Sequence, residues 1–306
     1  MSLTPATAET LRSALATVVV VPVTPFQADG SPDWDTYAAL TGRLIDGGIT
    51  VITPNGNTGE FYALTPAEAR QAVEAAASAA NGRAELLAGV GHDIATAVDA
   101  ARHAADHGIR MVMIHQPVHP YVSAEGWVDY HAAIAGAVPD LGVVLYLRTP
   151  RITGAHIAEL ADRAPNVIGV KYGVRDATVF AAVARDTGLD RFTWLAGAAE
   201  LTAPAYWAAG AHGFTSGLAN VAPEIALAML TALRENDLGA AMKVWESARR
   251  FEELRLADDS ADNVSVVKEA LAQLGLCRAD VRPPSRPLPP AIKAEIAAIL
   301  ASWGMK

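Results

Sequence analysis

Lys171 is the residue of this sequence whose surroundings most clearly indicate chemistry. It lies inside the apolar run "NVIGVKYG" at 166–173, which contains no acidic residue, and it is the only lysine before Lys243. Because burial of an ammonium group is costly, the neutral amine becomes favoured and its pKa falls. A neutral amine attacks a carbonyl carbon to form a Schiff base, which then accepts electrons from the substrate. We therefore expect Lys171 to be a nucleophile; the alternative is a structural cation that pairs with a distant acid or reaches the surface.

Tyr146 is the second candidate, near the end of the apolar run "LGVVLYLR" at 141–148. A Schiff-base reaction needs a group that carries protons to and from the substrate, and a phenol near a cation can do this. The residue alone equally fits an aromatic side chain that fills the core.

The stretch "GNTGE" at 56–60 is the third candidate. Gly56 and Gly59 would let the backbone adopt positive φ and turn its N–H groups inward. Such a ring of donors, together with the Thr58 hydroxyl, suits a carboxylate. The alternative is an ordinary turn. We expect Glu60 to be a structural acceptor for the N–H groups of its own loop.

Short, nearly continuous apolar runs alternate with Ala-rich amphipathic stretches along the first three quarters of the chain. This pattern is typical of parallel strands covered by helices. Helix start signals include Thr65, Pro66 and Glu68 in N-cap, first-turn and capping-box positions. The expected strands are 18–23, 49–56, 84–91, 109–116, 141–148, 166–173, 191–198 and 211–217.

Eight such strand–helix units predict a TIM (β/α)8 barrel of the α/β class. A doubly wound sheet is the alternative, but no Gly-rich dinucleotide loop follows the first strand. After about residue 234 only helical patterns remain. We therefore expect a catalytic barrel over 1–235 and a C-terminal helical domain over 236–306. In a barrel of this kind the reactive groups lie at the C-terminal ends of the strands.

Composition limits the partners of the protein. A net charge of −9 over 306 residues argues against nucleic acid, which needs clustered basic residues. The lone Cys277 excludes an intrachain disulfide and fits a cytoplasmic location. Neither a signal peptide nor an apolar run of roughly 20 residues is evident, so we expect no membrane span.

The three candidates together resemble the dihydrodipicolinate synthase / N-acetylneuraminate lyase family. The motifs that carry the resemblance are "GNTGE", Tyr146 and "GVK" at 169–171, with "VPVTPF", "TSGLANV" and "VVKEALAQLGL" elsewhere. The resemblance covers nearly the whole chain. It implies a TIM barrel with C-terminal helices, assembly as a homotetramer or homodimer, and lyase chemistry on 2-oxo acids without a metal or organic cofactor.

The resemblance also implies roles for single residues. Lys171 matches the Schiff-base lysine and Tyr146 the proton-relay tyrosine. Thr58 matches the carboxylate site, with Gly56 and Gly59 in its loop, and Thr215 lines the same pocket from the last strand.

Several positions differ from the synthase proper. Asn57 replaces a relay threonine, and an amide cannot pass on a proton as a hydroxyl does. His119 takes the place of a second tyrosine that the family supplies across the dimer interface, and Tyr121 follows two residues later. Arg148 and Arg151 remain as alternatives for holding the carboxylate of a second substrate.

These differences favour one branch of the family. The Tyr-x-Arg spacing, "TGEFYAL" and "VKYGVRD" are more similar to 5-dehydro-4-deoxyglucarate dehydratases. The sequence therefore predicts a dehydratase or aldolase of a 2-keto-3-deoxy sugar acid. The alternatives are a synthase that condenses pyruvate with aspartate semialdehyde, and a non-catalytic 2-oxo acid binding protein. A metal site is not expected, because His115 and His119 lie in a proline-containing loop with no evident third ligand.

Overall fold

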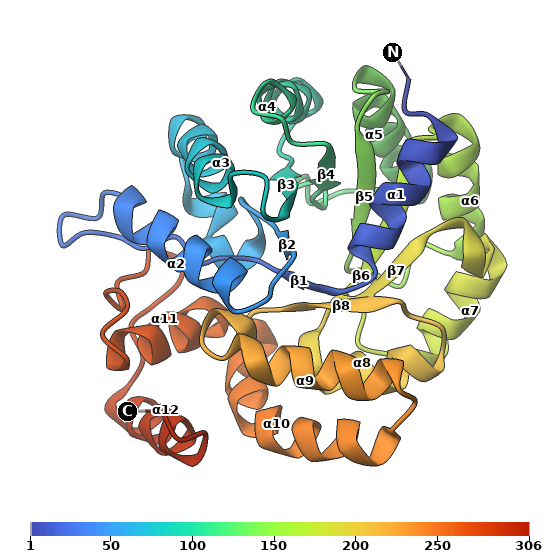
Figure 1. Ribbon diagram of the computed structural model, residues 1–306. Helices are drawn as coiled ribbons and strands as arrows, with labels where there is room; N and C mark the ends of the chain where they lie inside the picture. Colours follow the sequence, from blue (N-terminus) through green and yellow to red (C-terminus); the bar gives the residue numbers. More distant parts are fainter. Residues whose placement is uncertain (1, 306) are drawn as a thin grey trace.

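The computed structural model describes residues 2–305 and contains a closed barrel of eight parallel strands in chain order (Figure 1). Strand β8 pairs with β1 and closes the barrel. The strands are β1 (Val18–Val20), β2 (Val51–Ile52), β3 (Glu85–Val90), β4 (Met111–Ile114), β5 (Gly142–Leu147), β6 (Val167–Tyr172), β7 (Thr193–Ala196) and β8 (Gly213–Ser216). Each lies within one of the eight predicted runs, so the predicted TIM barrel is confirmed.

Helices surround the barrel and form the C-terminal part of the chain (Figure 1). They are α1 (Pro5–Leu15), α2 (Trp34–Asp46), α3 (Pro66–Ala80), α4 (Ile94–Asp106), α5 (Ala124–Ala137), α6 (Gly154–Arg163), α7 (Ala177–Thr187), α8 (Ala199–Ala208), α9 (Pro223–Arg234), α10 (Leu238–Ser260), α11 (Asn263–Gln273) and α12 (Pro290–Ser302). Thr65 and Glu68 form the predicted capping box of α3.

Helix α1, which we did not predict, closes the end of the barrel where the strands begin. Its Leu11 and Leu15 are fully buried in a cluster with barrel residues such as Met113 and Leu195. A Cβ atom at Gly142, the first residue of β5, would lie 3.1 Å from Leu11 Cδ1. The opposite end, where the strands finish, is therefore the one available for a site.

The C-terminal helices share a second core with the barrel. Phe251 of α10, Val267 of α11 and Ile296 of α12 are fully buried together with Val23 and Leu218 of the barrel. The proposed domain boundary at 235/236 falls in the turn between α9 and α10. Because this core joins the two parts, the helices are held in fixed positions against the barrel.

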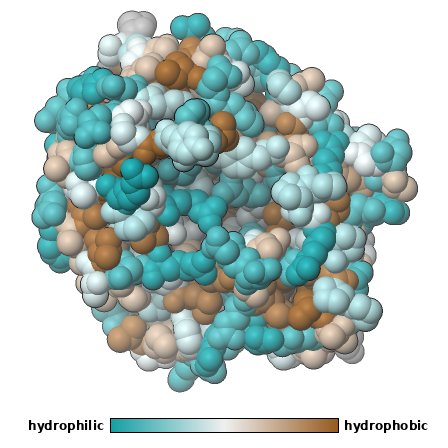
Figure 2. All heavy atoms as spheres, turned by 180° about the vertical axis from the view of Figure 1, so that it is seen from behind, coloured by the Kyte–Doolittle hydropathy of each residue, from teal (hydrophilic) through white to brown (hydrophobic). Residues whose placement is uncertain are grey.

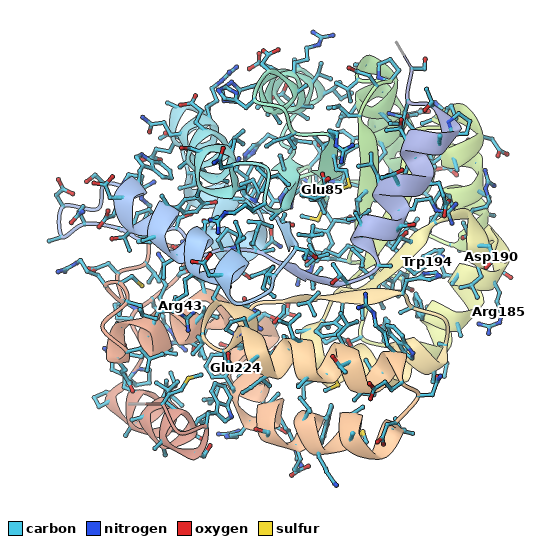
Figure 3. All side chains as sticks on the ribbon, viewed as in Figure 1. Arg43, Glu85, Arg185, Asp190, Trp194 and Glu224 are labelled. Carbon is cyan, nitrogen blue, oxygen red and sulfur yellow. The ribbon has the colours of Figure 1, made fainter. Side chains whose placement is uncertain are left out.

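Polar side chains tie the outer helices to the strand ends. Arg43 of α2, for example, donates hydrogen bonds to the carbonyl groups of Asn220 and Val221 after β8 (Figure 3).

The face opposite that of Figure 1 carries interspersed hydrophilic and apolar side chains (Figure 2). Within residues 2–305, no helix has the length and apolar character needed to span a membrane.

Candidate active site

Lys171 and Tyr146 are paired on neighbouring strands and buried in the barrel. Lys171 of β6 and Tyr146 of β5 are register partners in the sheet. The register between the two strands shifts earlier, between Val143 and Val144. The exposed fractions are only 5% for Lys171 and 7% for Tyr146, and Lys171 Nζ lies 4.3 Å from the centre of the Tyr146 ring. The amine and the phenol are thus presented to the same space.

Their surroundings favour the neutral form of each group. Burial lowers the pKa of Lys171 from its ordinary value of 10.5 to about 7, and the charges of Arg148 and Arg255 act in the same direction. Burial also raises the pKa of the Tyr146 phenol above its usual value, although the charge of Arg148 opposes this. Near neutral pH a large share of Lys171 is therefore a free amine beside a protonated phenol.

We expect the rate of imine formation with pyruvate to rise with pH through about 7 and then level off. Only the deprotonated amine attacks, so the rate should fall about tenfold per pH unit below that value. Reductive trapping rates measured between about pH 5 and about pH 9 test this. A midpoint near 10.5, the ordinary value for lysine, would mean that the amine is exposed to water.

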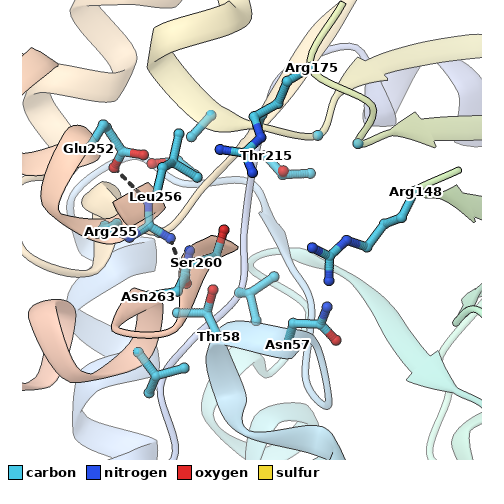
Figure 4. Close-up of a pocket in the computed structure, with 18 of the residues that line it drawn as sticks. Asn57, Thr58, Arg148, Arg175, Thr215, Glu252, Arg255, Leu256, Ser260 and Asn263 are labelled. Atoms are coloured by element: carbon cyan, nitrogen blue, oxygen red, sulfur yellow. Dashed lines mark hydrogen bonds and ion pairs between the residues drawn. The ribbon is translucent and has the colours of Figure 1, made fainter. Parts of the chain in front are cut away.

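A cavity of about 230 Å³ opens at the C-terminal ends of the strands, around Lys171 and Tyr146. Four of the predicted site residues line it with them: Asn57, Thr58, Arg148 and Thr215 (Figure 4). The Asn57 side-chain amide donates a 3.5 Å hydrogen bond to the Tyr146 hydroxyl. The structure therefore brings most of the predicted site together in one cavity.

The loop at 56–60 has the predicted position but not the predicted backbone. Gly56 has a φ of −85°, and the loop's positive φ angles belong to Asn55 and Glu60. The glycines instead provide space: a Cβ at Gly56 would lie 2.5 Å from Val21 Cγ1, and one at Gly59 would lie 2.9 Å from the carbonyl oxygen of Pro22. Packing against the end of β1, rather than positive φ, explains these two residues.

Glu60 anchors this loop to the C-terminal helices rather than to its own N–H groups. Its buried carboxylate pairs with the Lys268 ammonium of α11 and accepts a 2.9 Å hydrogen bond from the Arg282 N–H. Lys268 also donates to the Asp280 carbonyl group at 2.8 Å. The expectation for Glu60 was therefore right about a structural role and wrong about the partner.

Replacement of Lys268 by methionine is expected to lower the free energy of unfolding by roughly 3–5 kcal/mol, because it leaves the Glu60 carboxylate buried and unpaired. Urea unfolding measures this. The matched control is Lys293→Met: Lys293 forms a 3.0 Å pair with Glu269 at a more exposed position, so its loss should cost about 0–1 kcal/mol. Equal effects of the two substitutions would contradict this account of Glu60.

Four predicted site residues do not line the cavity: Gly56 and Gly59, which flank Asn57 and Thr58, and His119 and Arg151, which lie elsewhere. His119 is exposed in the loop after β4, where its Nδ1 accepts from the Tyr121 N–H at 3.1 Å. Arg151 is exposed and lines a separate hollow with Gln116 and Trp127. Neither side chain lines the cavity of its own chain, so Arg148 is the one of the two arginines that faces the Lys171 cavity.

One wall of the cavity comes from helices α10 and α11, which the sequence analysis did not anticipate (Figure 4). The run "EELRLADDSAD" at 252–262 was interpreted as a solvated face, but Glu252 and Arg255 within it are buried. Helix α10 is kinked at 257–259, and Ser260 and Asn263 beyond the kink also line the cavity. The C-terminal helices are therefore part of the site.

A second group of polar side chains lies outside this cavity. Glu74 of α3, His103 of α4 and His107, which follows α4, place possible metal-ligand atoms within 4.8 Å of one another. None of the three lines the cavity that contains Lys171. This cluster is therefore separate from the Lys171 cavity.

A buried lysine with a lowered pKa beside a tyrosine at the strand ends of a TIM barrel is the arrangement of an enzyme active site. A family model described as "Dihydrodipicolinate synthetase family" matches residues 14–302. The chain belongs to this family, which confirms the resemblance inferred from its motifs.

Similar proteins carry two kinds of name. A "Probable 5-dehydro-4-deoxyglucarate dehydratase" of Methylobacterium radiotolerans is 32% identical over 98% of both chains. A "4-hydroxy-tetrahydrodipicolinate synthase" of Phenylobacterium zucineum is 33% identical over 92% of this chain and 95% of that one. A solved structure described as dihydrodipicolinate synthase from Bacillus clausii is 40% identical, covers 96% of this chain and 100% of its own, and gives a TM-score of 0.93.

Proposed function

We propose that this chain is a lyase that forms a Schiff base between Lys171 and a 2-oxo acid, and that its substrate is a 2-keto-3-deoxy sugar acid. The observation that carries the proposal is the buried Lys171 amine, with its pKa lowered to about 7, beside Tyr146 in a cavity lined by arginines. Perturbed groups in a cleft are typical of catalytic residues. The dehydratase names of several relatives support the choice of substrate.

The proposed reaction begins when the Lys171 amine adds to C2 of the 2-oxo acid and water leaves. The resulting iminium makes the C3 proton acidic, because it accepts the electron pair that the proton leaves behind. After loss of the C3 proton, departure of the C4 hydroxyl as water gives dehydration. Alternatively, the iminium accepts the electron pair of the C3–C4 bond as the C4 hydroxyl loses its proton, which gives aldol cleavage. Dehydration therefore needs a proton donor close to the C4 oxygen, and cleavage needs a proton acceptor there.

Tyr146 is the proposed proton carrier. Its phenol is protonated at neutral pH and lies beside the amine. The Asn57 amide orients this hydroxyl by hydrogen bonding but cannot itself pass on a proton. A relay of hydroxyl groups therefore stops at position 57, which favours a reaction other than the condensation catalysed by the synthase.

Arg148 is the proposed partner of a second carboxylate at the distal end of the substrate. Its exposed guanidinium lines the cavity on the same side as Asn57 (Figure 4). Arginine binds carboxylates through charge-assisted hydrogen bonds, ideally two in parallel. The cavity thus suits an acid with a carboxylate at each end despite the net charge of −9.

Replacement of Arg148 by alanine is expected to lower kcat/KM for a 2-keto-3-deoxy sugar diacid by roughly tenfold, because one charge-assisted hydrogen bond is lost. Pyruvate has no distal carboxylate, so it should still form its imine at the same rate. The comparison is made at equal fractions of deprotonated Lys171, because loss of the Arg148 charge also changes the pKa of that amine. Arg163→Ala is the control, since Arg163 pairs with Asp129 on the outer helices. Equal losses for the diacid and pyruvate would exclude a distal role.

Turnover of 2-keto-3-deoxy sugar acids, compared with condensation of pyruvate and aspartate semialdehyde, tests the proposed reaction. We expect a higher kcat/KM for the sugar acids. Efficient condensation without sugar-acid turnover would restore the synthase alternative, which the name of the Phenylobacterium zucineum relative supports. Turnover of neither, with tight 2-oxo acid binding, would indicate a binding protein.

We also propose that the protein assembles from at least two copies in the cytoplasm. The loop after β4 exposes Val118 and Tyr121, at 57% and 86% of their surface. Apolar and aromatic side chains that project in this way are typical of protein–protein contacts. Light scattering after gel filtration measures the number of copies in the assembly. The cytoplasmic location is proposed because the half-buried free Cys277 fits a reducing compartment.

A further inference from the structure

Arg255 of α10 is a buried cation to which the proposed reaction assigns no direct contact with the substrate. Only 4% of its surface is exposed, although it lines the cavity around Lys171. Its Nη1 donates to Glu252 Oε1 at 2.5 Å and its Nη2 to Asn263 Oδ1 at 3.1 Å. Within the described residues, its Nε has no partner. A buried charge with incomplete hydrogen bonding is costly, which favours an anionic ligand next to it.

The chain makes room for this guanidinium at the end of β8. A Cβ atom at Gly217 would lie 2.0 Å from Arg255 Nη2 and 2.4 Å from Cζ. Gly217 follows Thr215 and Ser216, and all three line the cavity. Only glycine at this position therefore lets Arg255 extend from the C-terminal helices to the barrel's strand ends.

The acidic groups near Arg255 do not fully compensate its charge and that of the other cavity cations. Glu252 and Glu200 are fully buried, and Glu200 Oε1 accepts a 2.6 Å hydrogen bond from Ser216. Burial, and then the charge of Glu252, raise the pKa of Glu200 to about 8. Both effects favour the protonated form of Glu200, and Glu252 is the carboxylate that pairs with Arg255.

Of the three arginines that line the cavity, Arg148 and Arg255 lie on opposite sides of it, and Arg175 lies between them (Figure 4). Arg148 is on the side of Asn57, whose amide contacts the Tyr146 hydroxyl. Arg255 is on the other side with Asn263 and Ser260. The imine carbon C2 is trigonal, so the C1 carboxylate and C3 extend from it in different directions. Because Tyr146 must reach the C3 side to move protons, a substrate held as an imine on Lys171 would direct C1 toward Arg255.

We propose that Arg255 binds the carboxylate attached to the imine carbon, together with Thr58 of the loop that α11 packs against. This inference rests on the proposed Schiff-base reaction and assigns the two carboxylates of the substrate to two arginines. The rim residue Arg148 holds the distal carboxylate. The buried residue Arg255 binds the C1 carboxylate, which every 2-oxo acid possesses, and this contact sets the affinity of the site for 2-oxo acids.

Trapping by borohydride with pyruvate and with acetone, which lacks the carboxylate, tests the inference. The ratio of the two rates isolates recognition of the carboxylate, because a change in the reactivity of Lys171 affects both compounds alike. Arg255→Met is expected to lower the ratio of the pyruvate rate to the acetone rate roughly 10–100-fold, because a hydrogen bond between two charged groups is lost. Arg250→Met is the matched control on the same helix, where Arg250 pairs with Glu295 at the surface, and should leave the ratio unchanged.

Two further variants cover the case in which Arg255→Met alone unfolds the protein. Arg255→Met with Glu252→Gln removes both buried charges, and Asn263→Asp places a competing carboxylate against Nη2; each should lower the ratio. An unchanged ratio in the folded variants would overturn the role of Arg255. So would a loss confined to 2-oxo acids with a second carboxylate. If the unmodified protein forms no adduct with pyruvate, the proposed function itself fails.

Discussion

Replacement of Lys171 by alanine is expected to reduce turnover of the 2-oxo acid substrate to the level of the uncatalysed reaction. The imine and its capacity to accept electrons exist only if this amine is present. Lys171→Arg should be equally inactive, because arginine keeps the positive charge but does not lose its proton in proteins. The two variants together separate the need for an amine from the need for a cation.

The control is Lys243→Ala, which removes an exposed lysine from α10 and should leave turnover unchanged. Circular dichroism establishes that each variant is folded. Activity above one tenth of the unmodified level in either Lys171 variant would show that another group forms the covalent intermediate, or that none is formed.

Replacement of Tyr146 by phenylalanine is expected to lower kcat by roughly 10²–10⁴-fold, the contribution of general acid–base catalysis. Only the hydroxyl is removed, so the ring that packs against Lys171 remains. Trapping of pyruvate on Lys171 should persist, although more slowly. Single-turnover measurements separate imine formation from the later proton transfers.

Tyr172→Phe is the matched control for Tyr146→Phe. Tyr172 is the buried tyrosine that follows Lys171, and its hydroxyl has no hydrogen-bond partner within residues 2–305. Removal of that hydroxyl should leave turnover unchanged. If Tyr146→Phe behaves in the same way, Tyr146 only fills the barrel.

The barrel could be predicted from the sequence because its signals are local. Apolar runs such as 141–148 and 166–173 are buried on both faces, and their order along the chain is also their order around the barrel. The inward placement of Lys171 beside Tyr146 follows from that order. Helix α1 was missed because its two buried residues, Leu11 and Leu15, give only a short apolar stripe in a polar segment.

The rest of the site depends on contacts between distant parts of the chain. Glu60 and Lys268 are 208 positions apart, and Arg255 reaches Gly217 only after α10 has packed on the barrel. A run rich in Asp, Glu and Arg has the same composition whether it is solvated or lines a cavity. The glycines of "GNTGE" do not line the cavity, and the close packing that explains them could be recognised only from the positions of Val21 and Pro22.

Borohydride reduction of the protein in the presence of pyruvate tests the central claim most directly. Lys171, with its pKa lowered to about 7, is predicted to form a single imine. The mass of the chain should then increase by one pyruvic acid, less one water lost on condensation, plus the two hydrogen atoms added on reduction. Peptide mapping should place the adduct on Lys171. No adduct, or an adduct that persists in Lys171→Ala, would contradict the account.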